Sequence, residues 1–257
     1  MDAAKLRNRA REGGMVRGAM MFEFFSPGVA QLLVHAGCDY VIYDMEHTGI
    51  GLETIKAQVA YCRGLDLVPM VRVPRGEYAF LAGALDVGAR GVMIPMVESV
   101  TQAEAIVEAT HYPPVGRRGA AFGFAHDAYA AGTPADKIRD AHAATTVIAQ
   151  IETERGLEAV EDIAAVDGID VLWVGHFDLT NFLGIPGQFD HPDFLAALKR
   201  VVAAGRAHGK GLGFLATDAA TMAAFRDHGF NMLAAGTDMG LLMSGVQSVL
   251  AGIGDDA

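Results

Sequence analysis

The chain has 257 residues, of which 51% are hydrophobic and 20% charged, and its formal net charge at neutral pH is −11. This length and composition predict a single globular domain over residues 1–257 with a substantial core. The acidic balance argues against nucleic acid or an anionic membrane as a partner, since both would repel the chain.

The first residues, "MDAAKLRNRAREGG", lack the apolar segment of a signal peptide, and no apolar run reaches the roughly 18 residues of a membrane span. Cys38 and Cys62 stand far apart without a CxxC motif, and the histidines form no HExxH pair. A zinc site built from thiolates or imidazoles is therefore not indicated. We expect a soluble cytoplasmic protein whose partners are small molecules.

Short apolar runs alternate with helical segments along the chain. The runs, which are candidate strands, cover 15–24, 40–47, 67–74, 90–98, 145–152, 170–178, 211–217 and 231–238. The helical candidates cover 51–64, 101–111, 153–166, 191–209 and 217–229. The runs are apolar throughout rather than alternating, as expected of a parallel sheet that helices cover.

Eight such units at a spacing of roughly 25 residues predict an α/β fold, the TIM (β/α)8 barrel. An open doubly wound sheet is the alternative, but it would require a glycine-rich fingerprint after the first strand, and "FEFFSPG" is not one. The connection from about Thr110 to Ala144 is unusually long, and such loops are usually functional or disordered. A last apolar helix at 240–253 would cap the barrel or dock on another subunit.

The active site of a TIM barrel forms at the carboxyl ends of its strands. Several of the predicted strands end on polar residues, so these side chains would gather at one rim of the barrel. They are Asp44, Glu46, His47, Arg72, Gln150, Glu152, His176 and Asp178.

Glu152 and Asp178 are predicted to end neighbouring strands, whose axes lie about 4.8 Å apart. Two carboxylates this close repel one another unless a proton or a cation lies between them. With no thiolate or imidazole cluster nearby, the cation would be Mg²⁺, Mn²⁺ or Co²⁺, with adjacent positions open to a chelating 2-oxo acid. The alternative is that each acid only caps the helix after it.

Three more residues of this rim are candidates for the chemistry. Arg72 can stabilise a developing enolate oxygen, or else form a surface salt bridge. His47 is a candidate base because histidine titrates near neutrality, although a lone histidine at a rim is often structural. Asp44 is a further catalytic candidate, and it could equally cap the turn.

Five segments together resemble the HpcH/HpaI aldolase family, the metal-dependent class II pyruvate aldolases related to citrate lyase β-subunits and macrophomate synthase. They are "YDMEHTGIG", "PMVRVP", "LDVGARGVMIPMVES", "YPPVGRRG" and "QIETERGLEAVEDIAAVDGIDVLWVGHFDLTNFLG". The resemblance implies reversible cleavage of a 4-hydroxy-2-oxo acid to pyruvate, or a related 2-oxo acid, and an aldehyde. The enolate formed on the way would be held by the metal and Arg72.

The resemblance also implies roles for single residues. Glu152 and Asp178 would bind the divalent metal. The pyruvyl group would contact Gln150 and the backbone around Phe177, that is, Gly175, His176 and Phe177.

His47 would accept the proton through a water, and Asp86 would raise its basicity. Asp86 should lie at the opposite end of its own barrel from His47, and it could more easily reach the histidine of a neighbouring subunit. This fits a family of hexamers with exchanged C-terminal helices. We therefore expect a homo-oligomer, a hexamer built as a trimer of dimers, that is needed for full activity.

The chain departs from the family beside Asp178. Where aldolases of this family typically read "GPADLS", this chain reads "GHFDLT", so His176 and Phe177 replace a proline and a small residue. A backbone contact would survive, but a bulkier side chain and a second potential acid or base change the pocket. Arg118 of "GRRG" matches a family arginine, which either contacts the acceptor or is a solvated loop charge.

Three alternatives stay open. Oxaloacetate decarboxylation uses the same enolate and is the expected side activity. A lyase acting on a CoA thioester would need a basic, open mouth for the nucleotide, which this acidic chain does not indicate. A non-catalytic barrel would show no dependence on a metal.

Overall fold

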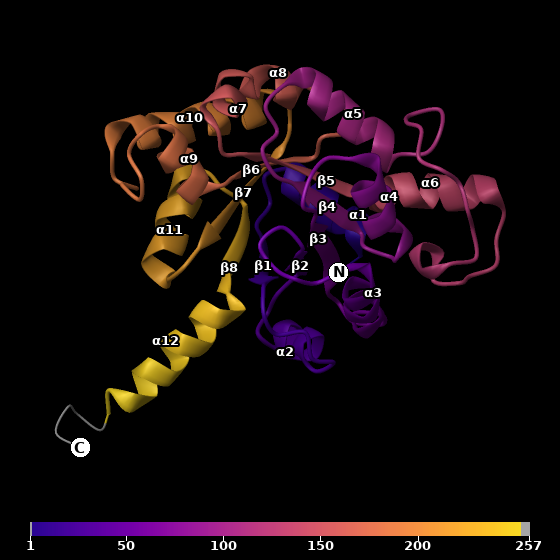
Figure 1. Cartoon of the computed structure of the whole chain (residues 1–257), viewed down its shortest axis with the longest axis horizontal. Helices are drawn as coiled ribbons and strands as arrows, with labels where there is room; N and C mark the ends of the chain where they lie inside the picture. Colours follow the sequence, from indigo (N-terminus) through magenta and orange to yellow (C-terminus); the bar gives the residue numbers. More distant parts are fainter. Residues whose placement is uncertain (1, 253–257) are drawn as a thin grey trace.

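The structure, a computed structural model, describes residues 2–252 and contains a closed barrel of eight parallel strands in chain order (Figure 1). The predicted TIM barrel is confirmed, and the doubly wound alternative is wrong because β8 pairs with β1. The strands are β1 Val16–Met21, β2 Tyr40–Asp44, β3 Val68–Arg72, β4 Gly91–Ile94, β5 Thr146–Ile151, β6 Val171–Val174, β7 Gly211–Ala216 and β8 Met232–Thr237.

Helices surround the barrel, and each predicted helix is present in some form (Figure 1). The segment predicted at 153–166 is divided at Ala159 into two short helices, α7 and α8. The helices are α1 Ala3–Arg11, α2 Val29–His35, α3 Leu52–Tyr61, α4 Tyr78–Asp86, α5 Val100–Thr110, α6 Pro134–Ala144, α7 Glu154–Glu158, α8 Val160–Ala165, α9 His176–Phe182, α10 Pro192–Ala207, α11 Ala219–His228 and α12 Asp238–Leu250.

The long connection between Thr110 and Ala144 is not a continuous loop. It contains the 3-10 helix η1 (Ala125–Asp127) and the helix α6. Thr133 caps α6, and Pro134 takes the first helical position, where a proline costs no hydrogen bond. The sequence analysis missed this helix because its apolar residues are mostly alanines, and none of its side chains is buried.

The strands stop earlier than the apolar runs suggested. β6 ends at Val174 and α9 begins at His176, so the prediction that Asp178 ends a strand is wrong: it lies in the first turn of a helix. Glu152 directly follows the last residue of β5. Both acids nevertheless lie at the carboxyl end of the barrel.

Side chains of each strand alternate between the barrel interior and the layer under the helices. In β2, Tyr40 and Ile42 pack in the interior, whereas Val41 and Tyr43 pack under the helices. The next residue on the interior face is Asp44. The same spacing leads from Met70 to Arg72 and from Ile148 to Gln150 and Glu152. An apolar strand therefore ends on a polar residue because its last interior position faces the barrel mouth.

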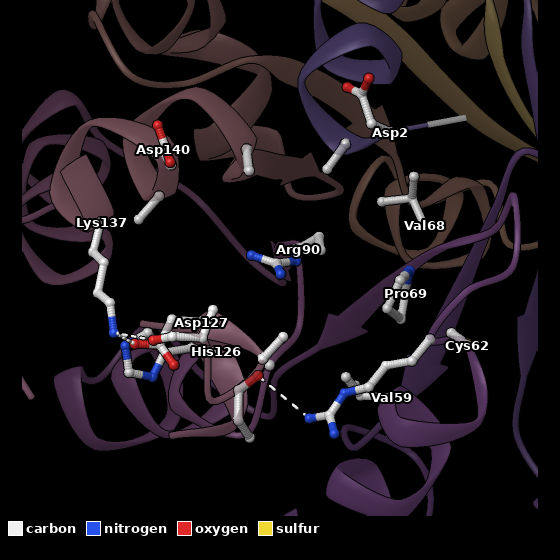
Figure 2. Close-up of a pocket in the computed structure, with 18 of the residues that line it drawn as sticks. Asp2, Val59, Cys62, Val68, Pro69, Arg90, His126, Asp127, Lys137 and Asp140 are labelled. Atoms are coloured by element: carbon white, nitrogen blue, oxygen red, sulfur yellow. Dashed lines mark hydrogen bonds and ion pairs between the residues drawn. The ribbon is translucent and has the colours of Figure 1, made fainter. Parts of the chain in front are cut away.

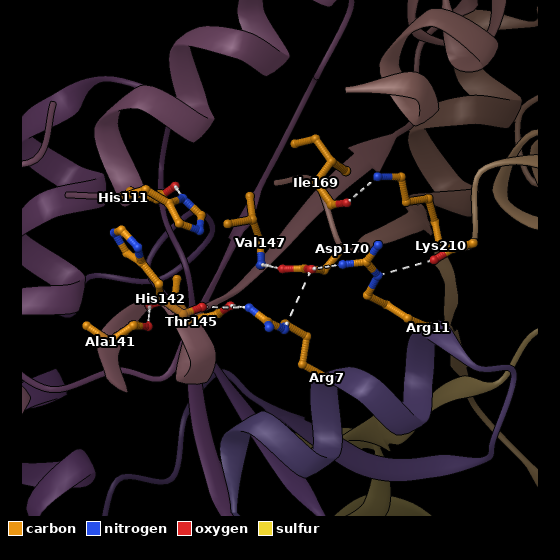
Figure 3. A network of polar contacts seen from close by, with 12 residues as sticks. Arg7, Arg11, His111, Ala141, His142, Thr145, Val147, Ile169, Asp170 and Lys210 are labelled. Atoms are coloured by element: carbon orange, nitrogen blue, oxygen red, sulfur yellow. Dashed lines mark hydrogen bonds and ion pairs between the residues drawn. The ribbon is translucent and has the colours of Figure 1, made fainter. Parts of the chain in front are cut away.

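The amino-terminal end of the barrel is covered by α1, whose Leu6 is fully buried against the interior side chains. Asp170, at the start of β6, accepts a hydrogen bond from Val147 N at 3.0 Å and lies 3.5 Å from Arg11 and 3.9 Å from Arg7 (Figure 3). A paired, buried carboxylate thus attaches α1 to the sheet.

The C-terminal helix α12 points away from the barrel (Figure 1). Its apolar side chains are exposed, with Met243 at 60% and Val249 at 77%. The helix was predicted to extend to Ile253, which lies outside the described residues. Within residues 2–252, no helix has the length and apolar character to cross a membrane.

Candidate active site

One half of the rim is built on the ends of β2 and β3, which pair at Asp44 and Arg72. Arg72 Nε donates to Asp44 Oδ1 at 2.5 Å, and both side chains are buried. The other Asp44 oxygen accepts from His47 N at 2.9 Å. Asp44 therefore does two things: it orders the turn that carries His47, and it orients the guanidinium of Arg72.

Arg72 is held from three sides. Its Nη1 lies 3.1 Å from Glu46 Oε2, and its guanidinium lies 5.5 Å from the centre of the Phe22 ring. Among residues 2–252, no acceptor contacts Nη2. This nitrogen is therefore free to donate to a substrate oxygen. The surface salt bridge considered for Arg72 is wrong, because the side chain is only 8% exposed.

Glu46 links Arg72 to His47, a role that the sequence analysis did not assign. Its Oε2 lies 3.6 Å from His47 Nε2 and has no well-formed hydrogen bond. Burial raises the pKa of Glu46, and Asp44 and Asp178 raise it further, against the opposing effects of Arg72 and His47. The available signal was its position between Asp44 and His47 in "YDMEH".

The other half of the rim surrounds Glu152. Its Oε1 accepts from Met96 N at 2.7 Å, and its Oε2 accepts from Gln150 Nε2 at 2.5 Å. Burial raises the pKa of Glu152 to about 7, and the nearby charges of Glu46 and Asp178 add to the shift. The remaining amide oxygen of Gln150 is buried without a partner.

Gly175 is required by the close approach of the Glu152 carboxylate. A Cβ at this position would collide with Glu152 Oε2 and lie 2.7 Å from Gln150 Nε2. Three residues later, Asp178 is half-buried in the first turn of α9, and it makes no hydrogen bond or ion pair within residues 2–252. Because residue 175 is a glycine, the Glu152 side chain can lie directly against the backbone that leads to Asp178.

The donors around Glu152 fit a hard divalent cation. Glu152 and Asp178 offer carboxylate oxygens, and neither is an imidazole or thiolate ligand. The unpartnered oxygens of Gln150 and Glu46 lie beside them. A cation would lower the energy of carboxylates that otherwise repel one another. Within residues 2–252, no group of three or more His, Cys, Asp or Glu side chains could hold an ion, so protein ligands beyond these two carboxylates are not indicated.

His176 and Phe177 turn away from Glu152 into an aromatic cluster. The His176 ring lies 4.9 Å from the Phe214 ring and 5.2 Å from the Phe189 ring, and Phe177 also packs on Phe189. Burial lowers the pKa of His176 to about 4, which leaves the ring neutral at pH 7. The contribution of this segment to a substrate site would therefore come from its backbone.

Asp86 and Arg118 are not part of this rim. Asp86 ends α4 and accepts a hydrogen bond from Arg118 Nη2 at 2.6 Å, while the Arg118 guanidinium lies 4.7 Å from the centre of the Tyr112 ring. Arg118 is 3% exposed, so its alternative as a solvated loop charge is wrong. Within its own chain, the imidazole of His47 lies 3.6 Å from the carboxylate of Glu46.

Comparison with known families fits this geometry. The sequence model of the family described as HpcH/HpaI aldolase/citrate lyase matches residues 19–245, which include the whole rim. The chain belongs to this family. Its homologues over most of its length are aldolases, that is, carbon–carbon lyases.

Two curated relatives and one solved structure illustrate the similarity. The hydroxypyruvate/pyruvate aldolase of Roseovarius nubinhibens is 37% identical over 228 residues, which cover 89% of this chain and 88% of the relative. The 5-keto-4-deoxy-D-glucarate aldolase of Shigella boydii is 34% identical, over 87% of this chain and 86% of its own. The HpcH/HpaI aldolase of Desulfitobacterium hafniense superposes with a TM-score of 0.92 at 29% identity, over 98% of this chain and 97% of its own.

Proposed function

We propose that this family member is a metal-dependent aldolase that cleaves a 4-hydroxy-2-oxo acid to pyruvate, or a related 2-oxo acid, and an aldehyde. One observation carries the proposal: Asp178 lies close enough to both Glu46 and Glu152 for its charge to raise the pKa of each, and Glu46 also raises the pKa of Glu152. A cation that binds there completes the charge balance and leaves ligand positions for the substrate.

Glu152 and Asp178 hold the divalent metal, Mg²⁺, Mn²⁺ or Co²⁺. When bound, the ion supplies Lewis acidity toward the keto group of the 2-oxo acid. Gln150 and Met96 N keep the Glu152 carboxylate in place through their hydrogen bonds. The backbone N–H groups of His176 and Phe177, at the start of α9, are available to the substrate carboxylate, whereas the Gly175 N–H donates to Ile151 O at 3.2 Å.

Arg72 stabilises the negative charge that develops in the reaction. Removal of the C4 hydroxyl proton breaks the C3–C4 bond, the aldehyde leaves, and the electron pair moves to the C2 oxygen as an enolate. Arg72 Nη2 donates to that oxygen, while Asp44 and Glu46 fix the guanidinium. Preorganised donors of this kind often supply the largest part of catalysis.

His47 accepts the hydroxyl proton, directly or through a water. Its side chain is 58% exposed and lies 3.6 Å from Glu46 Oε2. Glu46 therefore orients the imidazole within one chain. Asp86 acts on the His47 of a neighbouring subunit, and its 55% exposed side chain supports this because it is open to a contact between chains.

The active form is a homo-oligomer, a hexamer arranged as a trimer of dimers. The exposed apolar side chains of α12 support this, because a helix with Leu242, Met243 and Val249 each more than half exposed is unfavourable in water. A variant that stays monomeric in light scattering and keeps full turnover would contradict this part of the proposal.

Proton exchange of pyruvate in D₂O tests the enolate directly. We expect Mg²⁺ or Mn²⁺ to support loss of the methyl proton signal in NMR, EDTA to stop it, and Glu152→Gln to abolish it. The control is Glu161→Gln, an exposed glutamate that pairs with Arg200. Exchange that survives both EDTA and Glu152→Gln would contradict the proposal.

A panel of acceptors then separates the related activities. Condensation of pyruvate with an aldehyde supports the aldolase, and decarboxylation of oxaloacetate is expected at a lower rate through the same enolate. Cleavage of a CoA thioester without turnover of free oxo acids would assign the site to a thioester lyase instead.

A further inference from the structure

A second cavity of about 640 Å³ lies at the amino-terminal end of the barrel (Figure 2). Its wall is formed by the ends of α1 and α3, the start of β3, the 3-10 helix η1 and one side of α6. Pro69 of β3 lines it, whereas Arg72 of the same strand lies at the catalytic rim. Three residues of a strand separate the two by about 10 Å along the sheet. A cavity of this size suits a small ligand.

The side chain of Arg90 lies in the middle of this cavity (Figure 2). Within residues 2–252, its guanidinium makes no hydrogen bond, ion pair or ring contact. Burial lowers the pKa of Arg90, and the positive charges of Arg63 and Arg118 lower it further, against the opposing effect of Asp127, which forms its ion pair with Lys137. A largely buried cation without a counter-ion is costly, and such groups are normally paired.

His126 supplies a second set of unused polar atoms. Both of its ring nitrogens are buried without a hydrogen-bond partner, and the ring lines the same cavity. Burial and the charge of Arg118 lower the pKa of His126, so the ring is neutral at pH 7. Because both nitrogens are enclosed, the ring adds neither a charge nor a hydrogen bond for a ligand in the cavity.

The other cations around the cavity already have partners. Lys137 donates to Asp127 at 2.6 Å and to Ala130 O at 2.7 Å. Arg63 donates to Ala125 O and lies over the Tyr129 ring. Among the described residues of the cavity wall, Arg90 is therefore the cation without a partner, which matches a ligand with one negative charge better than a dianion.

Four aspartates also line the cavity, and each is paired with a basic side chain: Asp2 with Lys5, Asp127 with Lys137, and both Asp136 and Asp140 with Arg139. Much of the remaining wall is aliphatic. Val59, Leu67, Val68 and Pro69 line one side, and short alanine side chains from α6 and η1 line the other. No Phe, Tyr or Trp of the described residues lines the cavity, so it offers no surface on which a nucleotide base could stack.

We propose that this cavity is a second, non-catalytic binding site for a small aliphatic monocarboxylate, which Arg90 binds through its guanidinium. The planar fork of an arginine matches a carboxylate with two parallel hydrogen bonds. The site is independent of the proposed aldolase reaction, since none of its lining residues belongs to the rim.

Binding of isobutyrate to the full-length protein in EDTA tests this site. Isobutyrate has no keto oxygen, and EDTA removes any metal, so the catalytic rim does not retain it. Calorimetry or ligand-observed NMR should show saturable binding that weakens at least about tenfold in Arg90→Gln, because a charged hydrogen-bond pair is lost. Arg155→Gln, in which an exposed arginine is changed, should bind like the unmodified protein.

Two further probes define the ligand class. Isobutyramide has the same shape without the charge and should bind at least tenfold more weakly, and inorganic phosphate should bind more weakly than isobutyrate. Equal binding of isobutyrate and isobutyramide, tighter binding of phosphate, or unchanged isobutyrate affinity in Arg90→Gln would each overturn the proposal.

Thermal unfolding separates a ligand site from a structural role. Because Arg90 has no partner in the protein, Arg90→Gln should unfold at the same temperature as the unmodified protein or higher, and it should lose the upward shift that isobutyrate causes. A variant that unfolds several degrees lower would show that Arg90 holds the fold, which contradicts the proposal.

Discussion

Buried acids at the two ends of the barrel have opposite surroundings. At the amino-terminal end, burial raises the pKa of Asp170, but Val147 N–H, Arg7 and Arg11 all oppose the rise. At the carboxyl end, burial raises the pKa of Glu152, and Glu46 and Asp178 add to the rise. Asp170 is a structural anchor with Arg7 and Arg11 as counter-ions, whereas Glu152 forms no ion pair within residues 2–252.

The difference explains why only one end suits catalysis. The oxygens of an acid such as Asp170 already have partners within the protein, so binding a further ligand would not lower its free energy. When a cation binds between acids that repel one another, the repulsion is relieved and the free energy falls, so the folded protein favours cation binding at this end of the barrel. The predictions below test whether this contrast is real.

Gly175→Ala should have the largest effect. The added methyl group would displace the Glu152 carboxylate and the Gln150 amide, so we expect metal-dependent pyruvate exchange to fall by about 10³-fold or more. The control is Gly28→Ala, where a Cβ meets nothing within 4 Å. Near-normal exchange in Gly175→Ala would show that the position of Glu152 does not matter.

Arg72→Lys tests the guanidinium that lies among the acids of the rim. A lysine keeps the charge but loses the fork that Asp44 and Glu46 orient, so kcat should fall by about 10²–10³-fold with a smaller change in KM. Steady-state kinetics check this against Arg75→Lys, the change of an exposed neighbour. A rise in KM with kcat unchanged would mean that Arg72 binds the substrate without stabilising the enolate.

Asp170→Asn and Glu152→Gln should change the stability of the metal-free protein in opposite directions. Asp170→Asn removes the counter-ion of Arg7 and Arg11, and we expect this loss to outweigh the gain from removing a carboxylate whose pKa burial raises, so the free energy of unfolding should fall by about 2 kcal/mol.

Glu152→Gln should raise the free energy of unfolding above pH 7 by about 1–3 kcal/mol. The pKa of Glu152 is higher in the folded protein than in the unfolded chain, so the unmodified protein loses stability as the pH rises from about 4.5 through about 7. The variant should lack this loss. Denaturant unfolding at pH 5 and pH 8 in EDTA measures both changes. If the free energy of unfolding fell in both variants, the contrast between the two ends of the barrel would be contradicted.

His176→Phe should have the smallest effect, confined to acid. The pKa of His176 falls to about 4 in the folded protein, so its stabilising contribution is complete above about pH 6.5 and is lost as the pH falls toward 4. A phenylalanine fits the aromatic cluster and does not titrate. On going from pH 8 to pH 5, the unmodified protein should therefore lose about 1–2 kcal/mol more of its free energy of unfolding than the variant does. Parallel stability curves from pH 8 to pH 4 would contradict this.

Several features of the rim could be predicted from the sequence because strand periodicity is local. Asp44, Arg72 and Glu152 follow apolar residues of the same parity, which places them at the barrel mouth without knowledge of the other strands. Asp178 was predicted near the same rim but in the wrong element. The strand ends before Gly175, and the helix that follows begins earlier than the apolar pattern suggested.

Other features depend on contacts between distant segments and left no local signal. Helix α6 escaped notice because its alanine-rich sequence buries nothing, and the aromatic cluster around His176 needs β7 and the loop before α10. The Arg90 cavity combines residues from α1, β3, η1 and α6, which lie up to about 140 positions apart in the chain.

The sequence by itself determined the barrel and the set of polar residues at its mouth, since both follow from the period of apolar side chains along each strand. Only the tertiary structure decided which of these charges have partners. Coulomb energies depend on distance and burial across strands and helices that the chain order does not join. For that reason Asp170 and Glu152, two acids beside similar apolar runs, differ in what surrounds them and in what they can bind.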